Sequence, residues 1–308
     1  MADEQNDWIS LQSPQLSAAI NPLGAQLSVL RDSQGRDLLW NGDAAVWAGR
    51  APILFPLIGE LAGGEFRVGS DTYKLPRHGF ARNKPFQVVA VTAAEALQPA
   101  QASQPAEATF RLSADESTLK VYPFQFQLDV SFALQGPSLA IKSSVRNLGR
   151  SPLTASVGYH PGFRWPLPFG QPRAAHFIEF EQDEGPTIRR LDSHGLLSPE
   201  RYPTPLRGRR LVLDDSLFKD DVVIFEGLHS RSVTYGADAG PRLRVDFPDA
   251  TYLGIWTKPS AAPFVCIEPW RGIADAAGFT GDFKDKLGAF AVAPGAVQEL
   301  NMRLTLLA

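Results

Sequence analysis

The stretch Phe124-Gln-Phe-Gln-Leu-Asp-Val-Ser-Phe-Ala-Leu134 carries an apolar side chain at every position on one side of a two-residue period. Because side chains alternate between the two faces of a β-strand, this period predicts a strand with one buried and one polar face. A turn follows at Gly136-Pro137, and the alternation resumes from Leu139 to Val145. The sequence therefore predicts an antiparallel β-hairpin here.

The same alternation returns further along the chain, from Leu243 to Phe247 and from Leu300 to Leu306. The 26 glycines and 25 prolines interrupt the chain too often for many long helices. No repeated strand–helix–strand pattern is present, so the sheets should be antiparallel and packed face to face. These observations predict an all-β protein built as a large antiparallel β-sandwich.

The domain organisation is expected to be simple, with one domain over residues 1–308. Residues 1–16 are interpreted as an N-terminal tail. Residues 92–108 are rich in Ala, Gln and Pro and lack aromatic side chains, which favours a loop expansion between two strands.

Composition limits the classes of partner. The formal charge is −3, and this argues against nucleic acid, because phosphate binding requires clustered positive charge. No run approaches the roughly 18 apolar residues of a membrane span, so no membrane partner is expected. The acidic start MADEQNDW is unlike a secretory signal, and the single cysteine, Cys266, fits a reducing compartment. A cytoplasmic location is therefore predicted.

Three segments contain residues able to move protons. His78 lies in Leu75-Pro-Arg-His-Gly-Phe-Ala-Arg82, and His160 lies in Gly158-Tyr-His-Pro-Gly-Phe163. Glu268 ends an apolar run in Phe264-Val-Cys-Ile-Glu-Pro-Trp270, where burial would raise its pKa toward that of a useful base. From local pattern alone, each of the three is equally well explained as a buried polar residue with its partners satisfied.

Other chemistries are less well supported. The chain has no G-x-S-x-G elbow, no P-loop and no G-x-G-x-x-G that opens a helix. His78, His160 and Glu268 are the residue types of a two-histidine, one-carboxylate iron site, but no H-x-H pair accompanies them, so no metal is expected. Cys266, within an apolar strand, is interpreted as a small hydrophobic residue. The remaining histidines, His176, His194 and His229, are interpreted as surface residues.

Five segments occur in an order that resembles a known family. They are Arg50-Ala-Pro-Ile-Leu-Phe-Pro-Leu-Ile-Gly59, the segments around His78 and His160, Tyr252-Leu-Gly-Ile-Trp-Thr-Lys-Pro259 and Cys266-Ile-Glu-Pro-Trp-Arg-Gly-Ile-Ala-Asp275. Together they resemble the aldose 1-epimerase (galactose mutarotase-like) family, in its shorter bacterial branch. The resemblance runs from about Ser17 to the C-terminus and leaves residues 92–108 uncovered.

The resemblance implies a β-supersandwich that interconverts the α and β anomers of aldoses without a metal or an organic cofactor. His160 would match the histidine that protonates the ring oxygen of the sugar. Glu268 would match the carboxylate that takes the proton from the anomeric hydroxyl. The family commonly has Gly-Gly-His where this chain has Gly158-Tyr159-His160, which leaves the role of Tyr159 and the substrate range open.

The resemblance also implies a set of sugar-binding residues. His78 would hydrogen-bond the sugar near its ring oxygen, Arg50 and Arg82 would line the same pocket, and Asp246 would match a sugar-binding aspartate. An indole, Trp256 or Trp270, could pack on the apolar face of the sugar, although a place in the core explains either residue equally well.

Two alternatives remain open. Arg50, Arg77 and Arg82 could bind a phosphate, which would make the enzyme a hexose-6-phosphate 1-epimerase. A β-sandwich with an aromatic-lined pocket could also bind carbohydrate without turnover. The expected partner is a small sugar or sugar phosphate, and the chain is expected to be a monomer or a homodimer.

Overall fold

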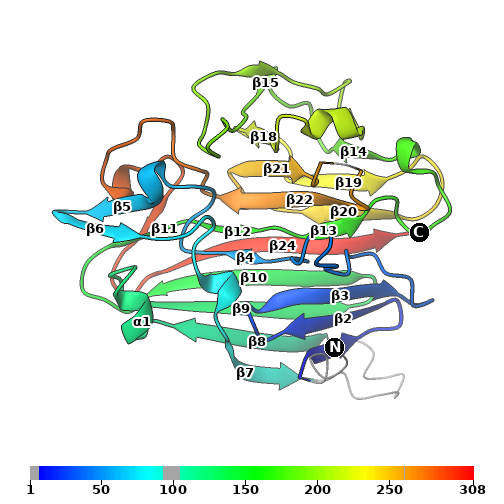
Figure 1. The fold of residues 1–308 in the computed structure, drawn as a ribbon. Coiled ribbons are helices and arrows are strands. Elements are labelled where there is room, and N and C mark those ends of the chain that lie inside the picture. The colour runs from blue at the N-terminus through cyan, green and yellow to red at the C-terminus, as the bar shows by residue number, and fades with distance from the viewer. Residues whose placement is uncertain (1–6, 93–104, 260) are drawn as a thin grey trace.

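The computed structural model describes residues 7–92, 105–259 and 261–308. A nine-stranded sheet forms its largest layer (Figure 1), and every neighbouring pair of strands in it is antiparallel. In spatial order its strands are β17 (Arg210–Val212), β14 (Phe177–Phe180), β19 (Ser232–Gly236), β20 (Arg242–Asp246), β24 (Val297–Leu307), β10 (Ser138–Asn147), β9 (Phe126–Gln135), β8 (Ala106–Ser113) and β7 (Gln87–Thr92).

The alternating segments of the sequence all lie in this sheet. The predicted hairpin is confirmed as β9 and β10, in which Val130 pairs with Ser143 and buried residues alternate with partly exposed ones. The other two segments form β20 and β24, and the four strands are neighbours in the order β20-β24-β10-β9. The period-two pattern therefore predicts the central part of the sheet correctly, because each of these strands has one apolar face on the core.

A six-stranded sheet packs against the large one. Its strands are β18 (Val223–Glu226), β21 (Tyr252–Trp256), β22 (Phe264–Arg271), β12 (Val157–Tyr159) and β4 (Ile53–Leu54), with β13 (Gly162–Arg164) pairing to β22. Leu253, Val265 and Ile267 from this sheet belong to the same apolar cluster as Val130 and Leu304 from the large sheet. This shared core confirms the predicted all-β sandwich.

Smaller elements surround the two layers. A third sheet contains β1 (Ile9–Gln12), β2 (Leu16–Asn21) and β3 (Gln26–Asp32). Three two-stranded ribbons pair β5 (Glu65–Val68) with β6 (Asp71–Lys74), β11 (Leu153–Ala155) with β23 (Phe290–Val292), and β15 (Thr187–Ile188) with β16 (Tyr202–Pro203). The helices are short: α1 (Glu116–Leu119) and the 3₁₀ turns η1 (Ala62–Gly64), η2 (Ala81–Asn83), η3 (Arg173–Ala175), η4 (Asp215–Phe218) and η5 (Phe283–Asp285).

Two boundaries differ from the sequence-based expectation. The N-terminal tail expected over residues 1–16 is too long, because Ile9–Gln12 form β1 and pair with β2. The expected loop expansion over residues 92–108 lies mostly outside the described residues. Its ends belong to strands, with Thr92 in β7 opposite Glu107 in β8, so the segment does connect two paired neighbours.

None of the helices in the described part of the chain has the length and the apolar character needed to cross a membrane.

Candidate active site

The outer face of the six-stranded sheet carries the candidate catalytic carboxyl. In β22, Val265 and Ile267 point into the shared core, so the alternation of the strand places Cys266 and Glu268 on the opposite face. Glu268 is only 1% exposed and lies opposite Gly254 in β21. The site therefore lies outside the sandwich core, under the loops that cover this sheet.

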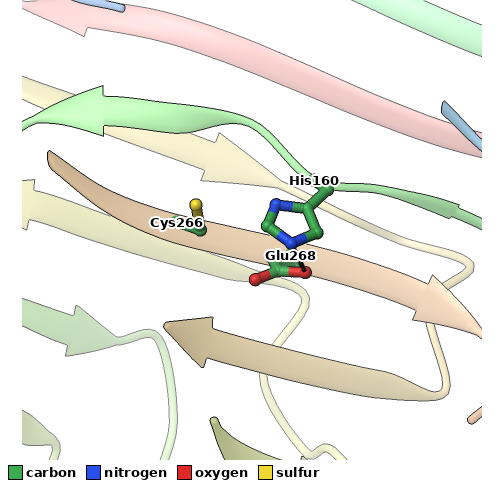
Figure 2. A group of neighbouring side chains, drawn as sticks. All are labelled: His160, Cys266 and Glu268. Atoms are coloured by element: carbon green, nitrogen blue, oxygen red, sulfur yellow. Dashed lines mark ion pairs between the residues drawn. The ribbon is translucent and has the colours of Figure 1, made fainter. Parts of the chain in front are cut away.

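His160 reaches the same face from the chain that leaves β12. Tyr159, the last residue of β12, belongs to the core, and His160 follows on the other side, with its backbone N–H donated to the Pro52 carbonyl at 3.2 Å. Figure 2 shows the imidazole lying over β22 and meeting the carboxyl group, with Nε2 of His160 at 3.2 Å from Oε2 of Glu268. The structure thus brings together the two residues that the sequence analysis assigned as acid and base.

Burial controls the charge of this pair. It lowers the pKa of the His160 imidazole to about 3, and the positive charges of Arg77 and Arg82 contribute in the same direction. Burial also raises the pKa of the Glu268 carboxyl well above its ordinary value, opposed by Arg77 and reinforced by Asp221. Burial therefore disfavours the charged forms of both groups.

His78 lies on the other side of the His160 ring, with the two ring centroids 5.9 Å apart and nearly perpendicular. Its backbone has a φ of 68°, a conformation that is uncommon for a residue with a Cβ, and Gly79 follows with a φ of 72°. A Cβ on Gly79 would lie 2.3 Å from the Phe55 carbonyl oxygen, so only glycine fits. Burial lowers the pKa of His78 well below its ordinary value.

A cavity of about 570 Å³ opens beside these groups. Its lining includes His78, His160 and Glu268, the indoles of Trp47, Trp256 and Trp270, and the charged side chains of Arg77, Arg82 and Asp221. Trp256 contacts the His160 ring edge-on at 5.6 Å, so this indole lies beside the acid–base pair. Aromatic faces with a few polar groups are typical of carbohydrate sites.

Arg50 does not line this cavity, contrary to expectation. Its guanidinium donates from Nη1 to the Ser28 carbonyl at 2.7 Å and lies over the Trp8 ring. Only its backbone is near the site, where the Arg50 carbonyl accepts the Gly162 N–H at 2.8 Å. The side chain therefore leaves in the other direction, toward the third sheet that contains Ser28.

Asp246 is also placed elsewhere. It ends β20 in the large sheet and accepts a hydrogen bond from Arg244 Nε at 2.7 Å. Besides Glu268, the acidic residue that lines the cavity is Asp221, which adopts a φ of 62° and whose Oδ2 lies 3.9 Å from Arg77 Nη2. No motif in the sequence marks Asp221 or Trp47, because both come from loops whose position depends on packing.

A metal ion would find three donors here. The ligand atoms of His160, Cys266 and Glu268 all lie within 4.8 Å of one another, and the three residues are buried. His78, the second histidine of the iron site weighed from the sequence, is not in this group. Figure 2 shows the Cys266 thiol on β22 beside His160 and Glu268. Burial raises the pKa of this thiol, and the charge of Glu268 adds to the effect, so it is a protonated and poor ligand.

His176 was interpreted as a surface residue, and this interpretation is wrong. It is 1% exposed, and its Nε2 accepts the Leu167 N–H at 3.1 Å. His194 and His229 are exposed, as expected.

Fold and cavity together define a galactose mutarotase-like β-sandwich protein. A solved galactose mutarotase-like protein from Lactobacillus casei superposes with a TM-score of 0.87 and 27% identity, covering 97% of this chain and 99% of that one. A galactose mutarotase related enzyme from Lactobacillus acidophilus superposes with a TM-score of 0.86 and 29% identity, covering 98% of this chain and 97% of that one.

Sequence comparison adds the family. The family model described as aldose 1-epimerase matches residues 7–280. Protein LacX from Lactococcus lactis subsp. lactis is 32% identical over an alignment of 275 positions, which covers 86% of this chain and 88% of that protein. The chain belongs to the aldose 1-epimerase family. It is therefore a sugar epimerase or mutarotase in the general sense, an isomerase whose partner is a small sugar.

Proposed function

We propose that this protein is an aldose 1-epimerase that interconverts the α and β anomers of an aldose, with Glu268 as general base and His160 as general acid. The observation that carries the proposal is the buried contact between His160 Nε2 and Glu268 Oε2, 3.2 Å apart at the wall of the cavity. Mutarotation needs one group to remove a proton and another to supply one, and these two side chains are within reach of the same small molecule.

The reaction proceeds through the open-chain aldehyde. Glu268 removes the proton from the anomeric hydroxyl O1 while protonated His160 delivers a proton to the ring oxygen O5. The bond from C1 to O5 breaks and the C1=O1 double bond forms, so protons and electrons balance. After rotation about the C1–C2 bond, the carboxylic acid returns its proton to O1, His160 recovers its proton from O5, and the ring closes with the opposite configuration.

Burial shifts both pKa values toward the protonation states at the middle of this cycle. The raised pKa of Glu268 and the lowered pKa of His160 both favour the carboxyl group as the place of the proton that the pair shares. The same single proton resides on the imidazole when the site is ready to open a ring. Because the site is buried, protonated His160 requires the negative charge of Glu268 beside it. This requirement couples the two proton transfers, one at O1 and one at O5.

The other cavity side chains hold the sugar. His78, Arg82 and Asp221 offer hydrogen-bonding groups to ring hydroxyls, and Trp256 offers an apolar face. These side chains and the acid–base pair supply every proton transfer that the reaction requires, so we expect turnover without a metal or an organic cofactor.

Anomer exchange measured by NMR saturation transfer on glucose and galactose tests the proposal. We expect the protein to accelerate exchange, and Glu268→Gln and His160→Asn each to reduce the rate by about 10²- to 10⁴-fold. His229→Asn is the matched control, because His229 is exposed on another loop. Near-normal exchange in both active-site variants would remove these roles. Sugar binding without accelerated exchange would instead indicate a non-catalytic carbohydrate-binding protein.

A phosphorylated aldose is the second candidate substrate, and Arg82 favours it. Burial lowers the pKa of this guanidinium, yet no carboxylate lies within 4.0 Å of it among the described residues. Its Nη2 donates only to the Arg77 carbonyl, at 2.8 Å. The charge of Glu60 acts on Arg82 only from beyond that distance, and a partly buried cation with no carboxylate in direct contact is stabilised by an anionic ligand. The site differs from the sequence-based expectation of three arginines, because Arg50 is absent from it.

Glucose and glucose 6-phosphate compared as substrates distinguish the two candidates. If Arg82 binds phosphate, Arg82→Gln will raise KM for glucose 6-phosphate at least about tenfold and leave KM for glucose nearly unchanged. Equal effects of the substitution on both sugars would assign Arg82 to the hydroxyl groups and exclude a phosphate role.

A further inference from the structure

Asp275 and Lys286 form a buried ion pair outside the cavity lining. Lys286 Nζ lies 2.6 Å from Asp275 Oδ1, and the residues are 3% and 2% exposed. In the described part of the chain no other ion pair has both side chains so deeply buried. Desolvation makes such pairs costly, and an apolar pair of similar size is often as stable or more so. The position of the Asp275–Lys286 pair in the structure indicates a more specific role than stability.

The remaining polar groups of Asp275 bind two neighbouring segments. Oδ2 accepts the Ala62 N–H at 2.9 Å, and the backbone N–H of Asp275 is donated to the Glu60 carbonyl at 3.0 Å. The Asp275 carbonyl accepts the Leu197 N–H at 2.7 Å. One residue therefore fixes the loop between β4 and β5 to the chain that leaves β22.

That loop holds the imidazole of His78. Gly59 donates its N–H to His78 Nδ1 at 3.2 Å, and the Gly59 carbonyl accepts the His78 backbone N–H at 3.0 Å. Gly59 has a φ of 74°, and a Cβ there would lie 2.4 Å from the Cβ of Ala274, the residue before Asp275. Direct contact along the chain thus links Asp275, Gly59 and His78.

Two donors compete for one lone pair on the His78 ring. Gly59 N–H approaches Nδ1, while Arg77 Nε lies 3.3 Å from Nε2. A neutral imidazole has one acceptor nitrogen, so only one of the two donors is satisfied. With Gly59 held in place, the acceptor is Nδ1 and the proton resides on Nε2, where it can be donated to a ligand. Arg77 Nε is already within hydrogen-bonding distance of Nε2, so if the loop moved and Gly59 released Nδ1, Nε2 would become the acceptor for Arg77 and the ring would lose this donor.

We propose that Asp275, neutralised by Lys286, is a positioning residue that selects the Nε2–H tautomer of His78 by fixing Gly59. The tautomer assignment stands on this geometry alone. Its effect on catalysis rests on the proposed function, in which His78 donates a hydrogen bond to the sugar.

Two double variants isolate the bond to Ala62. Asp275→Ala with Lys286→Met removes both buried charges and the acceptor for the Ala62 N–H. Asp275→Asn with Lys286→Met removes the same charges and keeps an amide oxygen at that position. Unfolding midpoints of the two variants and the wild type establish that each is folded at the temperature of measurement.

Side-chain ¹⁵N NMR reports the tautomer, and the His78 signals are assigned by their loss in His78→Gln. We expect Nε2–H in the wild type and in the asparagine variant. The alanine variant should shift toward Nδ1–H, with kcat/KM for anomer exchange reduced by up to about 10²-fold. An Nδ1–H wild type, an unchanged tautomer in the alanine variant, or equal shifts in both variants would overturn the proposal. Because the tautomer is measured without substrate, a wild type that does not catalyse exchange would contradict the proposed function and leave this test intact.

Discussion

Tyr159 occupies the position where the family resemblance leads one to expect glycine, and its side chain points away from the cavity. It is 1% exposed, and its hydroxyl donates to the Leu300 carbonyl in β24 at 2.7 Å. Its φ is not positive, unlike those of His78 and Gly79. Tyr159 therefore neither strains the backbone nor narrows the sugar site; it joins the two sheets of the sandwich.

Substitution of Tyr159 should separate stability from activity. Tyr159→Phe leaves the buried Leu300 carbonyl without this donor, so we expect a loss of about 1–3 kcal/mol in the free energy of unfolding. The rate of anomer exchange should stay within about twofold, because no atom of the cavity moves. Urea unfolding and NMR exchange on the same samples provide the measurement. A large loss of exchange with unchanged stability would place Tyr159 in the site.

Arg50 and Asp246 show why residue type and motif position are insufficient to assign a residue to a site. The sequence pattern associates both with the expected site, but the direction of each side chain depends on the strand or turn to which the residue belongs. Arg50 presents its carbonyl to Gly162 and its guanidinium to Ser28. Asp246 belongs to the large sheet, and the site is built on the small one.

At the scale of elements, side chains alternate between the two faces of β22, so core residues lie on one face and the candidate catalytic carboxyl lies on the other. Its residues are buried on both faces, so no polar–apolar pattern in the sequence indicates which face holds the site. In the sequence Glu268 stands out as a carboxylate within an apolar strand, and its expected role comes from the family resemblance of the segment around it. Cys266, two residues earlier, shares its face but offers no acid or base near neutral pH.

Substitutions at neighbouring positions of β22 should have opposite effects on stability and on activity. Ile267→Ala removes a side chain from the shared core, and we expect the free energy of unfolding to fall by about 2–5 kcal/mol. Where the variant is folded, exchange should remain close to that of the wild type. Glu268→Gln should show the reverse, with exchange lost and a small change in unfolding. Thermal unfolding paired with exchange rates tests both, and a similar loss of exchange in Ile267→Ala would contradict the separation.

At the scale of the whole molecule, the buried titratable groups link stability to pH. The pKa values of His78 and His160 are lowered in the folded protein, that of His160 to about 3. Below about pH 6.5 the unfolded chain protonates these imidazoles while the folded protein does not. The unfolded state then binds more protons, so the free energy of unfolding falls as the pH is lowered.

The Glu268 carboxyl has the opposite effect on the pH dependence of stability. Its raised folded pKa stabilises the protein below its ordinary pKa, and this contribution is lost as the pH rises toward the folded value. Burial lowers the pKa of His176 as well, and three histidines outweigh one carboxyl, so we expect stability to decrease between about pH 6.5 and pH 5. His160→Gln should reduce this slope by about 1.4 kcal/mol per pH unit. Urea unfolding across this range measures the slope, and an unchanged slope would contradict the burial of a neutral His160.

The sequence by itself determined the strands with an alternating pattern and the pair of residues that carry the proposed chemistry. An eleven-residue alternation identifies a half-buried strand because the period of two is a property of the local backbone. His160, His78 and Glu268 were recognisable because their neighbours form a pattern in order along the chain.

Only the tertiary structure decided where these elements meet. The order β20-β24-β10-β9, the location of the cavity on the outer face of the small sheet, and the entry of Trp47 and Asp221 all depend on contacts between distant segments. Such contacts are selected by the joint packing of side chains in one core, and no local pattern specifies them. The buried pair of Asp275 and Lys286 has the same origin: its role depends on a loop more than 200 residues earlier in the chain.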